Sequence, residues 1–569
     1  MSPIERRRLR VPRGDRQALI RPEPAALPAL VRRNQDLLAS YRFALAGRPF
    51  HEFRAAARAE VLALARCYAA RWGFSVPEWR EPMPIILSGH QPRPFHPGVW
   101  LKNFLAGELA AAVGGIALNL NVDNDEAHAQ VFRLPTRDLV CKMGGDEVRT
   151  VEVEFAPHAR GVPFEEQPAG AIRPETVDDV LALVPSPALG DAFRDCWQRL
   201  VQAVPEAASL GEAFIVARRR LEERLGLANL ELPVSALSDT SAFRFFVAAM
   251  LRRREDFFAA YNDSLHEFRR VYRERSPAQP VPDLASDPST HSGSPRARSP
   301  FENLRATLSK AEGSRGDGPR MELPYWIWRA GEPRRRLWVE PTPGGGLALA
   351  AEDEPVGRLG PADLADPAAG AERLAELRRS GWKIRPRAIS MTLFVRLAVG
   401  DVFIHGVGGA LYDQITDAII ERLFGVRPPE IILASATVHL PLETFPATPA
   451  DLSAAQRAVR DWRCNPDRLL PEGVRRGGEA KALTEEKKRL IATRGATRDE
   501  RRRIWQRIRE INGRLLTLAP EQPDAAREEL HRIQRYARYN DILTNREYPF
   551  CLYPAEDLAA FYRGAVCIG

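Results

Sequence analysis

A polar turn directly follows an apolar run, Pro-Ile-Ile-Leu-Ser, that has the length and composition of a short buried strand. The turn begins with Gly89, His90 and Gln91, and His96 and Gly98 come a few positions later. At the end of a strand, small residues let the backbone approach a ligand, and the amides that begin the next helix attract anions. The two imidazoles could then donate to phosphate oxygens and stabilise developing charge. The alternative is that the glycines serve turn geometry and the histidines satisfy loop carbonyls.

An acidic cluster follows the next strand-like run. It contains Asp123, Asp125 and Glu126, and His128 closes it. Carboxylates and an imidazole so close together could bind an amino group, orient a ribose, hold Mg²⁺ or act as a general base. The alternative is a helix N-cap followed by acidic first-turn residues, which the helix dipole favours. Capping explains one or two of these side chains but not the whole cluster, so the sequence favours a functional role.

A glycine-rich turn forms the third candidate site. It contains Gly406, Gly408 and Gly409, it follows His405 at the end of an apolar run, and Tyr412 comes soon after. Glycines between a strand and a helix give a phosphate or a nucleotide the close backbone approach that it needs. The same pattern also serves as a packing turn.

Four further side chains are candidates for ligand contacts. Arg385 and Arg387 offer planar guanidinium groups for a carboxylate or a phosphate. Ser435 and Thr437 lie at the end of another strand-like run. The alternatives are surface positions for the arginines and capping for the hydroxyls.

The elements that must position these residues are strands of one sheet. Strand, polar loop, helix and strand within about 45 residues predict a βαβ unit and therefore a parallel sheet. We expect neighbouring strands whose carboxyl ends meet, with Gly89, Asp123 and Gly408 less than about 20 Å apart, since one small ligand must reach them all. The four strands are expected at 84–88, 116–122, 401–405 and 430–435.

The rest of the chain suggests five segments, with 276–320 as a disordered loop because it is rich in Pro, Ser, Gly and Arg. A small β-rich hairpin subdomain is expected between residues 323 and 350. The segments are 1–80, an N-terminal helical lead-in; 81–204, the first half of the core; 205–383, a helical and β insertion; 384–475, the second half of the core; and 476–569, a helical hairpin and C-terminal tail.

Composition excludes several classes of protein. The chain has 569 residues, of which 44% are hydrophobic and 27% charged, as in soluble globular domains. No apolar run approaches the roughly 18 residues of a membrane helix, so we expect a cytoplasmic protein without membrane contacts. The net charge of +8 is diluted over the chain, and only seven of the 82 basic residues are lysine, a bias of composition that does not predict nucleic-acid binding. The six cysteines lack the spacing of a disulfide framework or a zinc site.

Taken in order, these motifs resemble the bacillithiol-biosynthesis cysteine-adding enzymes, the BshC family. The turn at Gly89 is similar to that family's G-Q-Q turn, and residues 121–128, which begin with Asn121, are similar to its A-E-D-H-D segment. Arg385-Pro386 and the loop from Gly406 to Tyr412 resemble its R-P segment and its G-G-P-G-E-x-x-Y loop. The strand end that contains Ser435 and Thr437 resembles its P-R-x-S-A-T segment, and a long helical segment follows in both.

The resemblance implies an α/β fold with a Rossmann-like parallel-sheet core, similar to class I nucleotidyltransferases, with inserted connecting segments and a C-terminal coiled-coil hairpin that makes a homodimer. It implies a ligase that adds cysteine to a glucosaminyl-malate amine, with small-molecule amine and amino-acid substrates. ATP or ADP and Mg²⁺ are the candidate cofactors. His90 and Gly409 depart from the family motifs, which predicts an altered substrate. The alternatives are a nucleotidyltransferase-like enzyme and a non-catalytic scaffold that retains the fold.

Within the ligase hypothesis, the turns at Gly89 and Gly408 hold phosphates, and Asp123 or Asp125 orients or deprotonates the amine. The candidate catalytic residues are His90, His96, Asp123, Asp125 and His128. The candidate nucleotide- or substrate-binding residues are Gly89, Gln91, Gly98, Asn121, Arg385, Gly406, Gly408, Gly409, Tyr412, Ser435 and Thr437.

A heptad pattern predicts the assembly. Apolar residues recur at seven-residue spacing over 481–518, which indicates one long helix, and a return helix of about 20 residues is expected near 524–543. The short helix cannot cover the whole apolar column, so a second subunit is expected to cover it. The alternative is that the hairpin folds back on its own core. The column consists of Leu483, Leu490, Ile504, Ile511 and Leu518.

Overall fold

The computed structural model describes residues 4–127, 130–138, 147–157, 159–273, 282–287, 319–493, 495 and 497–568. The chain divides into two compact units. Unit 1 consists of Met1–Arg133, Glu152–Val438 and Arg546–Gly569, and unit 2 of Leu134–Val151 and His439–Asn545.

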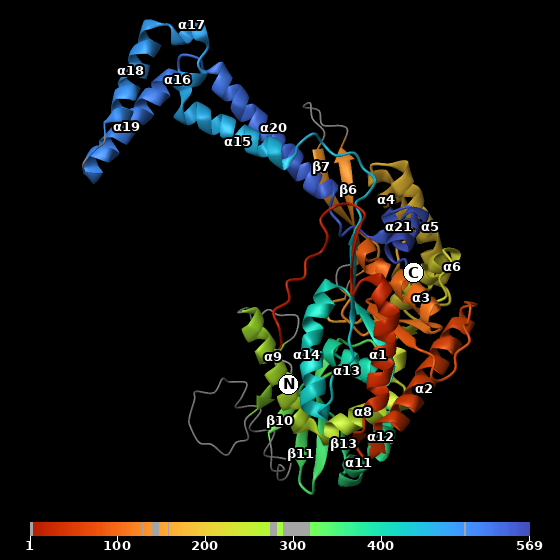
Figure 1. Cartoon of the computed structure of the whole chain (residues 1–569). Helices are drawn as coiled ribbons and strands as arrows, with labels where there is room; N and C mark the ends of the chain where they lie inside the picture. The colour runs from red at the N-terminus through yellow and green to blue at the C-terminus, as the bar shows by residue number, and fades with distance from the viewer. Residues whose placement is uncertain are drawn as a thin grey trace. The chain divides into compact units, whose positions relative to one another are not determined.

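A six-stranded sheet forms the centre of unit 1 in the described part of the chain. Figure 1 shows the ribbon of the whole chain. Its strand order is β1-β16-β15-β4-β5-β8, and every neighbouring pair is parallel except β1 with β16. The four strands expected from the sequence are therefore neighbours in one parallel sheet, as predicted. The strands are β1 (Gln17–Arg21), β4 (Ile85–His90), β5 (Ile116–Asn121), β8 (Leu230–Pro233), β15 (Val402–His405) and β16 (Ile432–Thr437).

Two crossovers leave the middle of this sheet in opposite directions. From β4 the chain runs through α3 (Pro97–Val113) to β5, and from β15 it runs through α14 (Val407–Phe424) to β16. Because β4 and β15 are adjacent, their carboxyl ends flank the point where the strand order reverses. Ligands of open α/β sheets bind at such a point. The buried apolar residues of β4 and β5 explain why these strands lie in the centre of the sheet.

Two helices, α1 and α2, lie within residues 1–80, where a helical N-terminal segment was expected. The expectation for residues 1–80 omitted β1, whose five residues pair with β16 more than 400 positions away. Apart from the helices next to the second sheet, the other described α-helices of unit 1 are α1 (Leu27–Ser40), α2 (Phe50–Arg71), α4 (Thr176–Leu183), α5 (Pro187–Ala203), α6 (Leu210–Arg224), α7 (Val234–Ser238), α8 (Ser241–Arg252), α9 (Arg254–Tyr272), α13 (Ala388–Ala398) and α21 (Ala555–Ala565).

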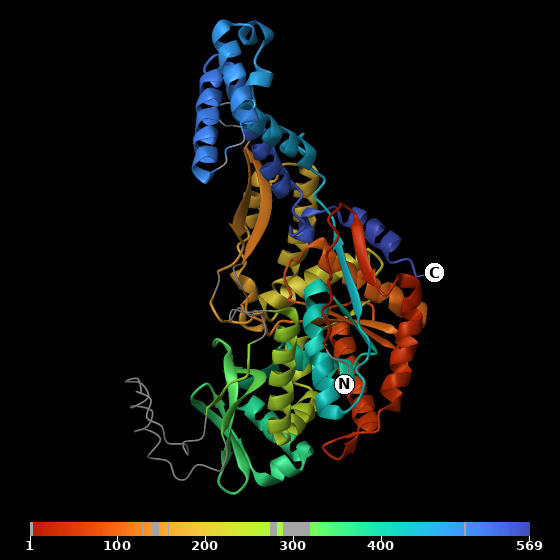
Figure 2. The ribbon, with the colours of Figure 1, turned by 60° about the vertical axis from the view of Figure 1, so that its left-hand side comes forward.

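A second sheet in unit 1 confirms and extends the expected β-rich subdomain (Figure 2). Its order is β13-β12-β11-β10-β14, its pairs are antiparallel, and β9 pairs with β10. Helices α11 (Pro361–Ala365) and α12 (Pro367–Arg379) precede its last strand. The strands are β9 (Ser286–Asp287), β10 (Arg320–Arg329), β11 (Arg335–Thr342), β12 (Gly346–Ala351), β13 (Glu354–Leu359) and β14 (Trp382–Pro386).

The loop expected at 276–320 falls mostly outside the described residues. Inside it, Ser286 and Asp287 form β9 and pair with the start of β10, so the expectation of disorder does not hold there. The prediction missed β9 because a strand of two residues is too short to carry an apolar pattern.

Unit 2 is mainly helical and begins earlier than the expected boundary at residue 476. Residues 546–569, expected to follow the hairpin as a tail, belong to unit 1, where the Tyr562 hydroxyl donates to the Pro97 carbonyl oxygen at 2.7 Å. Strands β6 (Val131–Asp138) and β7 (Glu147–Glu154) pair with each other, and most of each lies in unit 2. The helices are α15 (Pro449–Cys464), α16 (Pro466–Leu469), α17 (Glu472–Arg475), α18 (Gly478–Ala492), α19 (Arg498–Leu516) and α20 (Glu521–Leu543).

The expectation of one long helix over 481–518 is wrong, because that segment forms two helices, α18 and α19. Thr497 and Glu500 form a capping box that starts α19, and a Cβ at Gly495 would lie 2.9 Å from the Arg501 amide nitrogen. The two helices pair antiparallel, with Arg507 bonded to Glu486. The hairpin therefore forms between α18 and α19, and α20 packs against α15.

Among the helices that the structure describes, none combines the length and the apolar composition needed to cross a lipid bilayer.

Candidate functional site

A cavity of about 680 Å³ lies at the carboxyl ends of β4 and β15, wholly within unit 1. Its volume is in the range of small-molecule sites. The first and third candidate segments meet here, together with one member of the acidic cluster. The predicted site residues that line it are Gly89, His90, Gln91, His96, Gly98, Asp125, Gly406, Gly408, Gly409, Tyr412 and Ser435.

The first turns of α3 and α14 both line the cavity. At α3 the His96 side chain caps the helix, because its Nδ1 accepts from the Gly98 amide at 3.1 Å. At α14 the N-cap is Gly406, so no side chain caps that end, and a Cβ at Gly406 or Gly408 would have open space around it. The first amides of α14 are therefore open to an anionic ligand, which the helix dipole favours.

Two cations line the same side of the cavity, and sequence reasoning missed both. Lys102, on α3, is 5% exposed, and its Nζ donates to the Gly89 carbonyl oxygen at 2.7 Å. Arg546 Nη2 donates to Ser435 Oγ at 3.2 Å and lies 3.4 Å from His96 Nδ1. In the described part of the chain no carboxylate lies within ion-pair distance of Lys102 Nζ. Burial of this unpaired amine lowers its pKa to about 8.

Both histidines of the first turn are neutral near pH 7. Burial, with Lys102 second, lowers the pKa of His90 well below its usual value. Burial, followed by Arg546 and Lys102, lowers the pKa of His96 to about 3. Because Nδ1 of His96 accepts from Gly98, its hydrogen is on Nε2. His90 Nδ1 lies 3.3 Å from the Gln91 carbonyl oxygen, so its hydrogen is used there and its Nε2 can only accept from a ligand. His96 Nε2 can donate, and it lies 3.6 Å from Glu547 Oε2. Neither ring supplies positive charge.

Three residues of the acidic cluster were expected to be catalytic, and in the described part of the chain Asp125 alone of these lines the cavity. It accepts from Arg334 Nη1 at 2.7 Å, from Gln91 Nε2 at 2.9 Å and from the Glu126 amide at 2.9 Å. Although burial opposes it, Arg334 and these hydrogen bonds hold the pKa of Asp125 below its usual value. Asp125 is thus a fixed anion and a weak base.

Trp326, from the second sheet, forms another part of the wall. The guanidinium carbons of Arg387 and Arg334 lie 4.2 and 4.7 Å from its ring centroid. Arg387 Nη2 also donates to Glu322 Oε1 at 2.5 Å, whereas its Nε and Nη1 have no hydrogen-bond partner among the described residues. Asn124 Oδ1 is also buried without a partner. Both residues line the cavity, although these unpartnered atoms are themselves buried.

His405, at the end of β15, is held by a chain of charged groups. Its Nε2 lies 3.1 Å from Asp413 Oδ2, and Arg396 Nη1 donates to the same oxygen at 2.7 Å. Burial raises the pKa of Asp413, but Arg396 and His405 outweigh it and lower that pKa. A Cβ at Gly409 would lie 2.9 Å from His405 Nδ1, so the glycine leaves room for the ring. This arrangement fixes an imidazole at the cavity wall.

Four predicted residues do not line the cavity. Asp123 accepts from the Ser235 amide at 2.8 Å and from its hydroxyl, and burial, with Glu165 second, raises its pKa to about 7. Asn121 bonds to Glu231 and Arg218, and Thr437 Oγ1 donates to the Pro12 carbonyl oxygen at 2.6 Å. These side chains join parts of unit 1, so the expectation that they bind substrate is not supported.

Arg385 also lies away from the cavity. It is 1% exposed and bonds to Glu165 and Asp239, each at 2.9 Å. Its neighbour Arg387 lines the cavity instead. His128 lies outside the described residues.

Sequence reasoning missed several residues of the cavity lining because no local pattern marks them. Lys102 and Arg546 are single basic residues in a chain rich in them, and Trp326 and Arg334 belong to the second sheet. The carboxylates of the acidic cluster predict that a cation lies nearby. The sequence does not show that this cation is Arg334.

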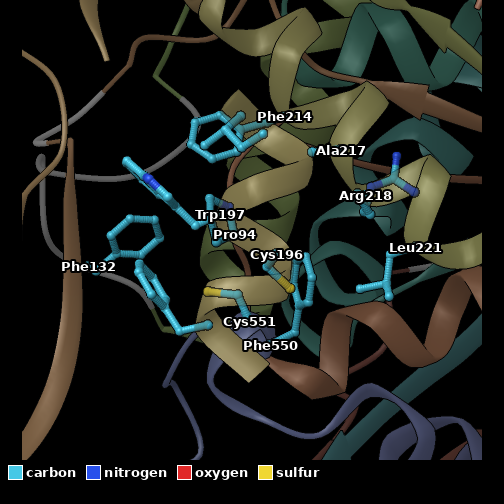
Figure 3. A pocket seen from close by; sticks show the side chains of 12 residues that line it. Pro94, Phe132, Cys196, Trp197, Phe214, Ala217, Arg218, Leu221, Phe550 and Cys551 are labelled. Carbon is cyan, nitrogen blue, oxygen red and sulfur yellow. The ribbon is translucent and has the colours of Figure 1, made fainter. Parts of the chain in front are cut away.

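Two further observations concern metal-binding groups and a second cavity in the described part of the chain. The described residues contain no group of three or more His, Cys, Asp or Glu side chains placed to hold a metal ion. A second cavity, of about 30 Å³, has the volume of one water molecule (Figure 3). Aromatic side chains and the thiols of Cys196 and Cys551 line it, and burial raises the pKa of both thiols. It is too small for a substrate.

The chain matches no protein-family model and no curated protein sequence. The resemblance to the cysteine-adding enzymes therefore stays a prediction, as do the cofactors.

Proposed function

We propose that this protein is a nucleotide-dependent ligase that condenses a small acid with an amine in the cavity between β4 and β15. In this proposal unit 1 is a Rossmann-like core similar to class I nucleotidyltransferases, and the cysteine-adding family supplies the reaction class. The observation that carries it is the position of the cavity. It lies where the crossovers through α3 and α14 diverge, with the uncapped start of α14 on its wall.

The cationic side supports phosphate binding. The open amides of α14, the unpaired Lys102 and the guanidinium of Arg546 can all donate to phosphate oxygens. Neutral His96 adds a single hydrogen bond through Nε2, because its Nδ1 accepts from Gly98. Mg²⁺ is proposed only as the counterion of the nucleotide's phosphates.

The opposite wall supports the acid and the amine. Asp125, fixed by Arg334, can orient an ammonium group, and the guanidinium of Arg387, which lines the cavity, can attract a carboxylate. In the proposed reaction, the acid's carboxylate attacks a phosphorus of ATP, and a phosphate-containing group leaves. The amine nitrogen then attacks the acyl carbon and releases phosphate or AMP. His405, oriented by Asp413, is the candidate group that takes the amine's proton.

Titration calorimetry with ATP and ADP tests the nucleotide half of the proposal. We expect binding at micromolar to millimolar concentrations, weakened about tenfold or more by Arg546→Ala, since one charge-assisted contact contributes roughly 1.5–3 kcal/mol. His90→Ala should weaken it less, because the ring is neutral. Thr437→Val is the matched control at the end of the same strand as Ser435, and it should leave affinity unchanged because Thr437 does not line the cavity.

Absence of nucleotide binding at millimolar concentration by the wild-type protein would remove this half of the proposal. The non-catalytic scaffold would then be the better hypothesis.

A further inference from the structure

We infer that Lys102 is a reactive amine of the cavity, one that forms an imine with a small aldehyde that carries an anionic group such as a phosphate. The inference goes beyond the proposed ligase. It shares with that proposal the anion-binding side of the cavity, including Lys102, which binds phosphate as an ammonium group in the ligase and reacts as a neutral amine here.

The surroundings of Lys102 distinguish it from the half-buried Lys383 and the buried Lys487. Its Nζ bonds to a neutral carbonyl oxygen, that of Gly89, at 2.7 Å. Lys383 instead pairs with Glu165 and Glu166, and Lys487 pairs with Asp467. Those carboxylates stabilise the protonated amine, and an ammonium group has no lone pair with which to attack a carbonyl carbon.

The bond to Gly89 is compatible with the neutral amine. A neutral amine keeps two hydrogens, so it can still donate one to the carbonyl oxygen while its lone pair stays available. The loss of a proton therefore breaks no contact of Lys102. Burial lowers its pKa to about 8, so roughly a quarter of the amine is neutral at pH 7.5, against about 0.1% for an ordinary lysine.

The cavity supplies what the aldehyde's anionic group needs. Lys102 lines the same 680 Å³ space as Gly406, Gly408 and Arg546. The open amides of α14 and the guanidinium can hold the anion while the aldehyde carbon meets Nζ. In the reaction the Nζ lone pair adds to the carbonyl carbon, two protons pass from nitrogen to oxygen, water leaves, and a C=N bond forms without oxidation or reduction.

Labelling with pyridoxal 5′-phosphate, followed by reduction with borohydride and peptide mapping, tests the inference. We expect Lys102 to be labelled at least about tenfold faster than Lys383 and Lys487, which serve as controls in the same molecule. Lys102→Arg keeps the positive charge and should remove that label. Pyridoxal without phosphate should label Lys102 more slowly, because it lacks the anion. Inorganic phosphate should protect the amine.

Label spread over the exposed lysines Lys481 and Lys488, with none on Lys102, would overturn the inference. Near-ultraviolet circular dichroism of Lys102→Arg shows whether the variant folds, and labelling of the wild-type protein decides the question in any case. Labelling repeated in the presence of ATP, together with the calorimetry described above, separates the two proposals. Label on Lys102 without protection or binding by ATP contradicts the ligase alone, whereas ATP binding without label on Lys102 contradicts only the reactive amine.

Discussion

Gly98 and Gly408 both lie in the first turn of a helix at the cavity, yet they tolerate a methyl group differently. A Cβ at Gly98 would lie 2.2 Å from the Ala436 carbonyl oxygen, whereas a Cβ at Gly408 would meet nothing within 4 Å. We expect Gly98→Ala to lower the free energy of unfolding by about 1–3 kcal/mol, the usual cost of overpacking. Gly408→Ala is the matched control and should change it by less than about 0.5 kcal/mol. Thermal unfolding of both variants measures the difference, and equal midpoints would contradict this prediction.

Asp123 allows a prediction about pH. Its pKa is raised to about 7 in the folded protein, so the folded state binds a proton that the unfolded state releases near pH 4. Stability is therefore lost as pH rises from about 4 to 7. Asparagine keeps both hydrogen bonds to Ser235 without the buried charge. We expect Asp123→Asn to have a higher free energy of unfolding than the wild type at pH 8. The difference between the two proteins should be about 1–3 kcal/mol larger at pH 8 than at pH 5.

Thermal unfolding of both proteins at the two pH values checks this expectation. An equal effect at both values would show that Asp123 is not protonated in the folded state. A loss of nucleotide binding in the same variant would return Asp123 to the site, from which its contacts with Ser235 remove it.

At the residue scale, sequence reasoning identified segments that line the cavity, but not always the side chain of each segment that does so. Asp123 and Asp125 are equivalent in the sequence, and so are Arg385 and Arg387. Which member of each pair lines the cavity depends on distant partners, such as Arg334 for Asp125. No local pattern contains that information.

At the scale of elements, the hairpin of α18 and α19 depends on a small apolar cluster. Leu515 is fully buried in it, whereas Ile491, at the end of α18, is 62% exposed. We expect Leu515→Ala to cost about 2–5 kcal/mol and to unfold the hairpin locally. Hydrogen exchange should then accelerate in α18 and α19 but not in β4 and β15. Ile491→Ala is the control and should leave exchange unchanged; acceleration spread equally over both units would contradict local unfolding.

The elements predicted best from sequence are those with a strong local pattern. The four parallel strands were predicted because each is a buried apolar run between turn residues. The heptad count failed at Thr497, since the apolar spacing continues across the break while the capping box starts a new helix. β1 was missed because five residues at the edge of a sheet carry little periodicity.

At the scale of the whole molecule, most of the apolar column that suggested a dimer already has partners within unit 2. Ile511 is buried with Leu515, and Leu483, Leu490 and Leu518 pack against the same cluster. The original reason for a second subunit therefore does not hold for these residues. Two side chains of the hairpin remain strongly exposed, Ile491 at 62% and Trp505 at 60%.

The homodimer stays a prediction, and it now rests on Ile491 and Trp505. A two-fold contact would bury four such side chains, each contributing at most about 1.5–3 kcal/mol, and association itself costs at least about 4 kcal/mol. We therefore expect weak self-association, with a dissociation constant in the micromolar range. Sedimentation equilibrium at tens of micromolar should detect dimers of the wild-type protein and monomers of the Ile491→Glu, Trp505→Glu double variant. Because both positions are exposed, the variant should keep its unfolding temperature, and a wild-type protein that stays monomeric would leave α18 and α19 as a hairpin that folds alone.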